Sequence, residues 1–233
     1  MSSNELNSAI APIVERAQNL INSYAQGKLL SKPIIAIAGG SGAGKSYFSE
    51  HLQAALQSRG YRVLVINQDG FSPYNEKNPD ALINVSAEKV DVFMQAIITG
   101  ELKIEVPSRI RNEHPYSSTT PSPYTITHQT VNMADVDLII FEGSLVLSSQ
   151  APYNFFHYCN MGIFIAATTQ HMCDWKTERE MAKPRELQRP KEIFDEHVQK
   201  AIRVYYDYVL PTKRNATFIV YKGNKDQYVV IEQ

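Results

Sequence analysis

Hydrophobic residues follow two different periodicities along this chain. Four segments have apolar residues three and four positions apart, the spacing of an amphipathic helix: about 4–25, 45–59, 86–99 and 191–210. Six shorter segments are rich in apolar residues, as is typical of strands in a buried sheet: 34–38, 62–67, 136–143, 161–166, 217–221 and 227–231. Because strands and helices alternate, the pattern predicts an α/β fold with a mostly parallel sheet and helices on both faces.

The remaining segments have a weaker pattern. Residues 102–106 predict a short strand, and 126–131 a strand that could pair with it as a hairpin. Residues 70–84 and 107–125 contain prolines and turn residues and predict loops, the first of them over the expected active-site edge. Residues 170–191 are charged and poorly periodic, so no regular element is predicted there.

Length, composition and charge narrow the class of protein. At 233 residues the chain is long enough for one sizeable α/β domain and short for two, so we expect a single domain over 1–233 with an additional helix at 1–26. Hydrophobic residues make up 43% of the chain and charged residues 20%, as in ordinary globular proteins. A net charge of -1 predicts no basic surface for nucleic acid, so the expected partner is a small molecule.

The cysteines and the apolar runs indicate the cellular compartment in which the protein is expected. Cys159 and Cys173 lack metal-ligand spacing, which favours a reducing environment without a disulfide framework. The first residues show neither the basic nor the apolar region of a leader, and no apolar run approaches the length of a membrane span. We therefore expect a cytoplasmic protein with no membrane partner, and we leave homo-oligomer formation open.

A glycine-rich loop follows the apolar run at 34–38. It matches the pattern G-x-x-x-x-G-K-[ST] with the residues Gly39, Gly40, Ser41, Gly42, Ala43, Gly44, Lys45 and Ser46. Glycines allow backbone N–H groups to wrap a triphosphate, and the helix that follows directs its positive end at the phosphates. In this pattern the lysine reaches the β- and γ-phosphates and the serine hydroxyl binds Mg²⁺, so the sequence predicts ATP and Mg²⁺ as cofactors.

Two carboxylates follow predicted core strands, at the sheet edge where open α/β proteins bind ligands. Asp69 is placed to accept the proton of an attacking hydroxyl, and Glu142 to hold Mg²⁺ directly or through water, with Asp69 as a further metal ligand. Either could instead be a turn residue at a strand end. A GTPase switch is disfavoured because no Asp has Gly three residues later and Asp226 is one position too early in its motif.

In chain order, the glycine-rich loop is followed by Gln68-Asp69-Gly70-Phe71, Pro79-Asp80-Ala81, Phe141-Glu142-Gly143 and Leu210-Pro211-Thr212-Lys213. Together these motifs resemble the uridine kinase and phosphoribulokinase family over roughly residues 33–222. The resemblance implies a P-loop kinase-type three-layer sandwich. It also implies that Asp69 is the catalytic carboxylate, that Asp80 contacts ribose hydroxyls and that His114 contacts the base. A turn role for Asp80 and a structural role for His114 are the alternatives.

The sequence departs from the family pattern in the expected acceptor pocket. Arg109 stands where the pattern has a tyrosine, and Tyr116 where it has an arginine, so the identity of the acceptor is open. Arg109 and Arg111 would suit an anionic acceptor such as a sugar phosphate, or they could be solvated. The end of the chain also resembles bacterial pantothenate kinase, a relative with a different acceptor.

Residues 176–191 are predicted to form a basic lid that closes over the γ-phosphate. The segment contains six cations: Lys176, Arg179, Lys183, Arg185, Arg189 and Lys191. Arg179 and Arg185 come nearest to the Arg-Asp and Arg-Gly-Arg motifs of the family lid and are the predicted catalytic arginines, together with Lys45. A solvated helix face is the alternative.

Three hypotheses follow. The first is an ATP-dependent kinase that phosphorylates a hydroxyl of a small metabolite, with the 5′-hydroxyl of uridine or cytidine preferred over a sugar phosphate or pantothenate. The second is a nucleotide-binding regulatory or assembly protein that has lost acceptor chemistry, since the acceptor pocket and the lid depart from the family pattern. The third is an ATPase stimulated by nucleic acid, which the charge disfavours.

Overall fold

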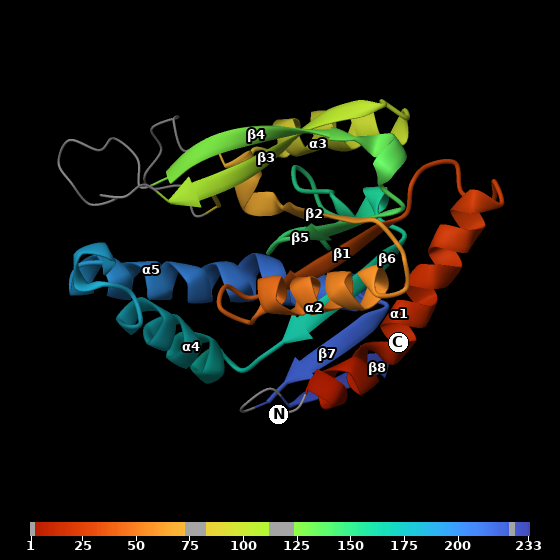
Figure 1. The fold of residues 1–233 in the computed structure, drawn as a ribbon. Helices are drawn as coiled ribbons and strands as arrows, with labels where there is room; N and C mark the ends of the chain where they lie inside the picture. Colours follow the sequence, from red (N-terminus) through yellow and green to blue (C-terminus); the bar gives the residue numbers. More distant parts are fainter. Residues whose placement is uncertain (1–2, 73–82, 112–123, 224–226) are drawn as a thin grey trace.

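The computed structural model describes residues 3–72, 83–111, 124–223 and 227–233. Its centre is a six-stranded sheet in the order β2-β5-β1-β6-β7-β8 (Figure 1). The strands are β1 (Ile34–Gly39), β2 (Val63–Asn67), β5 (Leu138–Glu142), β6 (Met161–Ala166), β7 (Phe218–Lys222) and β8 (Tyr228–Glu232). Neighbouring strands run parallel except for β8, which is antiparallel to β7. The predicted α/β fold with a mostly parallel sheet is therefore confirmed.

The middle of the sheet is the core of the molecule. Every residue of β1 and β5 is buried, and the neighbours that cover them include the fully buried rings of Phe48 and Phe155. The arrowheads of β6 and β7 in Figure 1 point toward the side on which α4 and α5 lie. The carboxyl ends of the parallel strands therefore face these two helices.

Five α-helices surround the sheet in the described part of the chain. They are α1 (Ser3–Ala25), α2 (Lys45–Gln57), α3 (Ala87–Ile98), α4 (Thr169–Met181) and α5 (Lys191–Val204). The predicted helix at 4–25 is confirmed, and it packs against α2 and β8 through a stripe that includes Ile10, Val14, Ala17 and Ile21. No helix among these residues combines the length and hydropathy needed to cross a membrane.

The predicted hairpin is longer than expected. Strands β3 (Lys103–Arg111) and β4 (Tyr124–Asn132) pair in antiparallel fashion as a two-stranded ribbon separate from the main sheet (Figure 1). The expectation of a loop over 107–125 was wrong for 107–111 and for 124–125, because Pro107 is tolerated at the edge of a ribbon. Each strand of such a ribbon has an open edge, where a missing N–H removes no ladder hydrogen bond.

Two helical segments also differ from the sequence prediction. The helix expected at 191–210 ends at Val204 and continues as a π-turn (Tyr205–Val209) and a 3-10 turn (Leu210–Asn215), since Pro211 cannot donate to a regular helix. Helix α4 was not predicted. Its buried positions are Met172, Lys176 and Glu180, spaced four apart, so the face turned inward is largely charged and gives no apolar pattern.

Candidate active site

The glycine-rich loop connects β1 to α2 and packs closely against α4 because it lacks side chains. Gly42 and Gly44 have left-handed backbone conformations, with φ of +91° and +92°. A Cβ at Gly42 would lie 2.8 Å from Cγ of Lys176 and 2.9 Å from the carbonyl oxygen of Met172. Helix α4 therefore packs directly on the loop, and α2 begins at Lys45 with its first N–H groups at the same place.

Lys45 folds back over this loop. Its Nζ donates hydrogen bonds to the carbonyl oxygens of Gly39 at 3.1 Å and Gly40 at 3.0 Å. Desolvation lowers the pKa of Lys45, and the carboxylate of Glu142 acts in the opposite direction. The ammonium group is thus held beside the loop at the position from which it can reach a bound phosphate.

Glu142 and Ser46 form a pair of oxygen ligands at the end of β5. The Ser46 hydroxyl donates to Oε1 of Glu142 at 3.0 Å, and the Asn67 amide donates to the same oxygen at 2.6 Å. Glu142 is only 4% exposed, and its Oε2 has no hydrogen-bond partner in the described structure. Burial raises the pKa of Glu142, which Lys45 opposes.

An unpartnered buried carboxylate oxygen beside a hydroxyl fits a divalent cation, because Mg²⁺ prefers oxygen ligands and retains several waters. The residues present therefore fit the magnesium ion that the loop predicts. Asn67 was missed by the sequence analysis. It lies directly across the β2–β5 pairing from Glu142, a register that the sequence does not reveal.

Asp69 lies in a 3-10 turn (Gln68–Phe71) that follows β2, and the Asn67 side chain caps this turn by accepting from the N–H of Asp69 at 2.8 Å. The carboxylate is about half exposed, with 51% of the side chain accessible. It forms an ion pair with Arg109 of β3. The next residue must be glycine, because a Cβ at Gly70 would clash with the carbonyl oxygen of Pro107.

Lys176 is the most buried cation of the predicted lid, at 4% exposure. Its Nζ donates to the Ser41 hydroxyl at 2.9 Å, so α4 contributes a second lysine to the phosphate-binding loop. Burial, followed by the charges of Arg179 and Arg189, lowers the pKa of Lys176 to about 8. The sequence offers no signal that separates Lys176 from the other lid cations, because the buried face of α4 is largely charged.

The buried carboxylate of Glu180 binds two other cations of the predicted lid segment. Glu180 accepts from the backbone N–H of Arg189 at 2.6 Å and from the Arg189 guanidinium at 2.5 Å, and it also pairs with Lys183. Arg189 is thereby held in the cavity wall, where Arg179 also lies. Arg185 is exposed in a short 3-10 turn (Arg185–Leu187) and does not line the cavity.

One cavity of about 760 Å³ brings these groups together. Its wall contains many of the predicted site residues: Ser41, Gly42, Gly44, Lys45, Ser46, Asp69, Arg109, Glu142 and Arg179. Gly39, Gly40 and Ala43 of the same loop are buried and do not line the cavity. Asp80, His114 and Tyr116 lie outside the described residues.

A parallel sheet whose first strand ends in this loop, with an acidic residue at the end of a neighbouring strand and a basic helix packed on the loop, defines a nucleotide-binding P-loop kinase. The chain belongs to the Phosphoribulokinase / Uridine kinase family, whose sequence profile matches residues 34–228.

Individual relatives are distant. Uridine-cytidine kinase B of Dictyostelium discoideum is 24% identical over 208 residues, which are 85% of this chain and 78% of the relative. A uridine kinase of Lactobacillus helveticus (strain DPC 4571) is 24% identical over 213 residues, 88% of this chain and 93% of the relative. In three dimensions the chain resembles a D-glycerate 3-kinase of Cryptococcus neoformans var. grubii, with a TM-score of 0.66 at 11% identity, covering 96% and 99% of the two chains.

Proposed function

We propose that this protein transfers the γ-phosphoryl group of ATP, in the presence of Mg²⁺, to a hydroxyl group of a small molecule. The observation that carries this proposal is that one cavity is lined by Lys45, by the Ser46–Glu142 pair and by Asp69. These are a phosphate cation, a pair of metal ligands and an accessible carboxylate, which are the parts that phosphoryl transfer requires.

In the proposed reaction Asp69 orients the acceptor hydroxyl and accepts its proton. The acceptor oxygen forms a bond to the γ-phosphorus while the bond from that phosphorus to the β,γ-bridging oxygen breaks, and ADP leaves. Ser46 and Glu142 would hold Mg²⁺, which when bound neutralises charge on the β- and γ-phosphates. The half-exposed position of Asp69 suits this role, because the hydroxyl must be able to reach it.

Cations from the loop and the lid stabilise the phosphate charge in this scheme. Lys45 and Lys176 lie at the loop, and Arg179 lies in the cavity wall. Because α4 already packs against Gly40 and Gly42, the lid excludes water from the phosphates when the site is filled. A catalytic role for Arg185 stays a prediction, and its exposed position favours Arg189 instead.

Uridine and cytidine are the first acceptors to test, because relatives named uridine-cytidine kinase B and uridine kinase match most of the chain. A second acceptor class, hydroxyl compounds that carry a phosphate or a carboxylate, is favoured by the contact of Arg109 with Asp69. Sugar phosphates and pantothenate belong to this second class.

The test combines binding and turnover. Trp175 is the only tryptophan of the chain and lines the cavity, so ADP·Mg²⁺ should change its fluorescence. Asp69→Asn should lower turnover by about 1,000-fold while nucleotide binding is retained. The matched control is Asp135→Asn, which alters an exposed aspartate at the opposite end of the sheet and should leave turnover unchanged. Full activity of Asp69→Asn would remove Asp69 from its proposed role.

A further inference from the structure

Arg109 occupies the acceptor side of the cavity. Its guanidinium forms an ion pair with Asp69 and lies over the ring of Tyr124, 4.4 Å from the ring centroid. These contacts are to the turn after β2 and to the ribbon, and not to the phosphate-binding loop. Arg109 is therefore placed to act on the molecule that approaches Asp69.

The position of Arg109 is fixed by the backbone. The carbonyl of Pro107 packs against Gly70 so closely that no side chain fits between them. Arg109 follows Pro107 by two residues and so projects from the same face of β3. The side chain is directed at Asp69 by this docking of the ribbon, and it is only 24% exposed.

A second arginine meets the same tyrosine from the lid. The guanidinium of Arg189 lies 3.5 Å from the hydroxyl oxygen of Tyr124, within a hydrogen bond. The carboxylate of Glu180 fixes the direction of Arg189 through both its backbone and its side chain. Two guanidinium groups, one from the ribbon and one from the lid, thus converge on one side chain of the cavity wall.

The described cavity wall carries more positive than negative charge. Five cationic side chains line it, Lys45, Arg109, Arg179, Arg189 and Lys200, against the two carboxylates Asp69 and Glu142. Lys45 contacts the phosphate-binding loop, where the nucleotide supplies compensating charge. The charge of Arg109 lies at Asp69 instead, where the acceptor must bind.

An uncharged acceptor would compete with Arg109. The hydroxyl of a nucleoside must approach the same carboxylate that the guanidinium already contacts, and its hydroxyl and carbonyl oxygens offer Arg109 only neutral acceptors that do not compensate its charge. An acceptor with its own anionic group offers that partner, because the guanidinium pairs with carboxylate or phosphate through two parallel hydrogen bonds.

We propose that the acceptor carries a carboxylate or phosphate group close to the hydroxyl that is phosphorylated, and that Arg109 is the residue that selects it. This inference rests on the proposed kinase function. It assigns the acceptor to the anionic class and argues against uridine and cytidine. Arg189 is the second arginine that contacts Tyr124 in the cavity wall.

The experiment measures phosphorylated product by mass spectrometry for matched pairs of acceptors. D-glycerate and pantothenate represent carboxylates, ribulose 5-phosphate represents phosphates, and glycerol, ribulose, uridine and cytidine are the uncharged counterparts. We expect product from at least one anionic compound, with a kcat/KM above that of every uncharged one. The carboxylate and phosphate arms show which anion the site takes.

Substitutions of Arg109 then test whether this residue selects the anionic acceptor. Arg109→Gln should lower kcat/KM for the anionic acceptor by about 100-fold, since one partner of a charged hydrogen bond is lost, while KM for ATP is unchanged. Arg109→Lys should retain part of the activity. The control is Lys103→Gln, which removes a positive charge from an exposed position of the same strand outside the cavity wall and should change neither constant.

Two results would overturn the inference and leave the kinase function intact: uridine or cytidine as the best substrate, or an unchanged kcat/KM in Arg109→Gln. If no compound is phosphorylated, the proposed function fails for this panel. The inference is then decided by thermal protection with Mg²⁺ and a non-hydrolysable ATP analogue. Protection by an anionic compound that is lost in Arg109→Gln supports it, and protection by uncharged compounds alone or by none contradicts it.

Discussion

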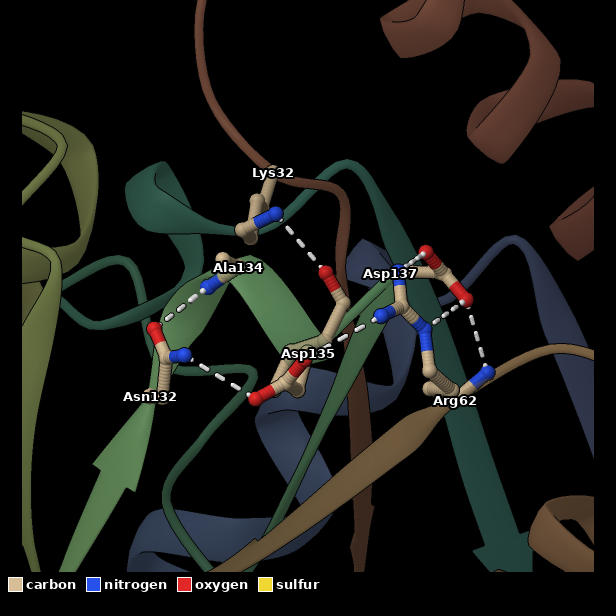
Figure 2. A network of polar contacts seen from close by, with 7 residues as sticks. Lys32, Arg62, Asn132, Ala134, Asp135 and Asp137 are labelled. Atoms are coloured by element: carbon tan, nitrogen blue, oxygen red, sulfur yellow. Dashed lines mark hydrogen bonds and ion pairs between the residues drawn. The ribbon is translucent and has the colours of Figure 1, made fainter.

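The strands β2 and β5 carry a polar cluster at each end, and the two clusters are built differently. At the amino end, Arg62 donates to both carboxylate oxygens of Asp137, at 3.1 and 2.7 Å, and to Asp135 at 3.4 Å (Figure 2). Lys32 donates to the carbonyl oxygen of Val136 at 2.7 Å, and Asn132 donates to Asp135 at 3.0 Å. Arg62 and Asp135 are more than half exposed.

At the carboxyl end, Asp69 is half exposed, but two other ionisable groups are withdrawn from water. Glu142 and Lys176 are each 4% exposed, and Oε2 of Glu142 has no partner in the described structure. A buried unpaired oxygen costs free energy unless a ligand compensates it, whereas the exposed pairs at the amino end need none. Incomplete pairing, and not the number of charges, therefore distinguishes the end of the sheet that contains the candidate site.

The two ends should differ most in how substitution of a carboxylate changes turnover. Glu142→Gln should lower turnover by about 100-fold or more, because it removes a charged metal ligand. Asp137→Asn makes the same chemical change immediately before the first residue of β5 and should leave turnover unchanged. Steady-state ADP release as a function of Mg²⁺ concentration measures both. Equal effects of the two substitutions would show that the difference between the clusters has no functional meaning.

Two glycines with similar backbone conformations should differ in how much their substitution lowers the free energy of unfolding. Gly42 at the site and Gly60 before β2 have φ of +91° and +87°, but only Gly42 has neighbours in the space of a Cβ. Gly42→Ala should lower the free energy of unfolding by about 3 kcal/mol, from backbone strain plus overpacking against α4. Gly60→Ala should lower it by about 1 kcal/mol, from strain alone. Urea unfolding of the two variants measures the difference, and equal losses would contradict close packing of the lid on the loop.

Lys176 offers a test by pH. As pH rises through about 8, the unliganded protein loses the proton of Lys176, and a neutral amine no longer attracts phosphate. KM for ATP should therefore rise above pH 8, by at most about tenfold per pH unit for one proton. In Lys176→Met, KM should be about tenfold higher at pH 7 and should lack this step. A step near pH 8 that survives in the variant would assign it to another group.

The same shift predicts a change in stability. Because the folded pKa of Lys176 lies below the usual value of 10.5, the unfolded chain binds more protons between about pH 8 and 10.5. The contribution of Lys176 to stability therefore rises with pH across this window. Below pH 8, unliganded Lys176→Met should be at least as stable as the natural protein, and this advantage should shrink toward pH 10.5 in thermal unfolding.

The smallest effect is expected at the amino end. The hydrogen bonds from Arg62 lower the pKa of Asp137 below its usual 3.8, so the pair stabilises the fold above that pH. Arg62→Ala should slightly lower the melting temperature at pH 7 without changing turnover. The difference should disappear as the pH falls below 3.8 through the lower folded pKa of Asp137. A loss of activity in this variant would show that the amino end also acts on the site.

Much of this architecture follows from local sequence. The apolar runs predict β1, β2, β5 and β6, and the glycine pattern fixes the loop between β1 and α2, because burial and close backbone approach each restrict residue type. Asp69 and Glu142 could be identified because each follows a predicted core strand, and the carboxyl ends of parallel strands meet at one edge of the sheet. Both side chains do line one cavity with Lys45.

Other contacts of the site could not be predicted, because they join segments that are far apart in the sequence. Asn67 reaches Glu142 through strand register, and Lys176 reaches Ser41 across the sheet edge. The buried face of α4 is charged, so the rule that buried faces are apolar fails there. Arg185 and Arg189 are both arginines of the predicted lid, and the sequence does not distinguish their roles. In the structure Arg189 pairs with the carboxylate of Glu180.

The central claim is that the carboxyl end of the sheet transfers phosphate to an organic hydroxyl. The most direct measurement follows the label of ATP radioactive at the γ-phosphate after incubation with Mg²⁺ and the acceptor panel. We expect that label enters an organic phosphate ester, that Asp69→Asn prevents this, and that omission of Mg²⁺ does the same. Label that is released only as inorganic phosphate, or that stays in ATP with every acceptor, would contradict the account.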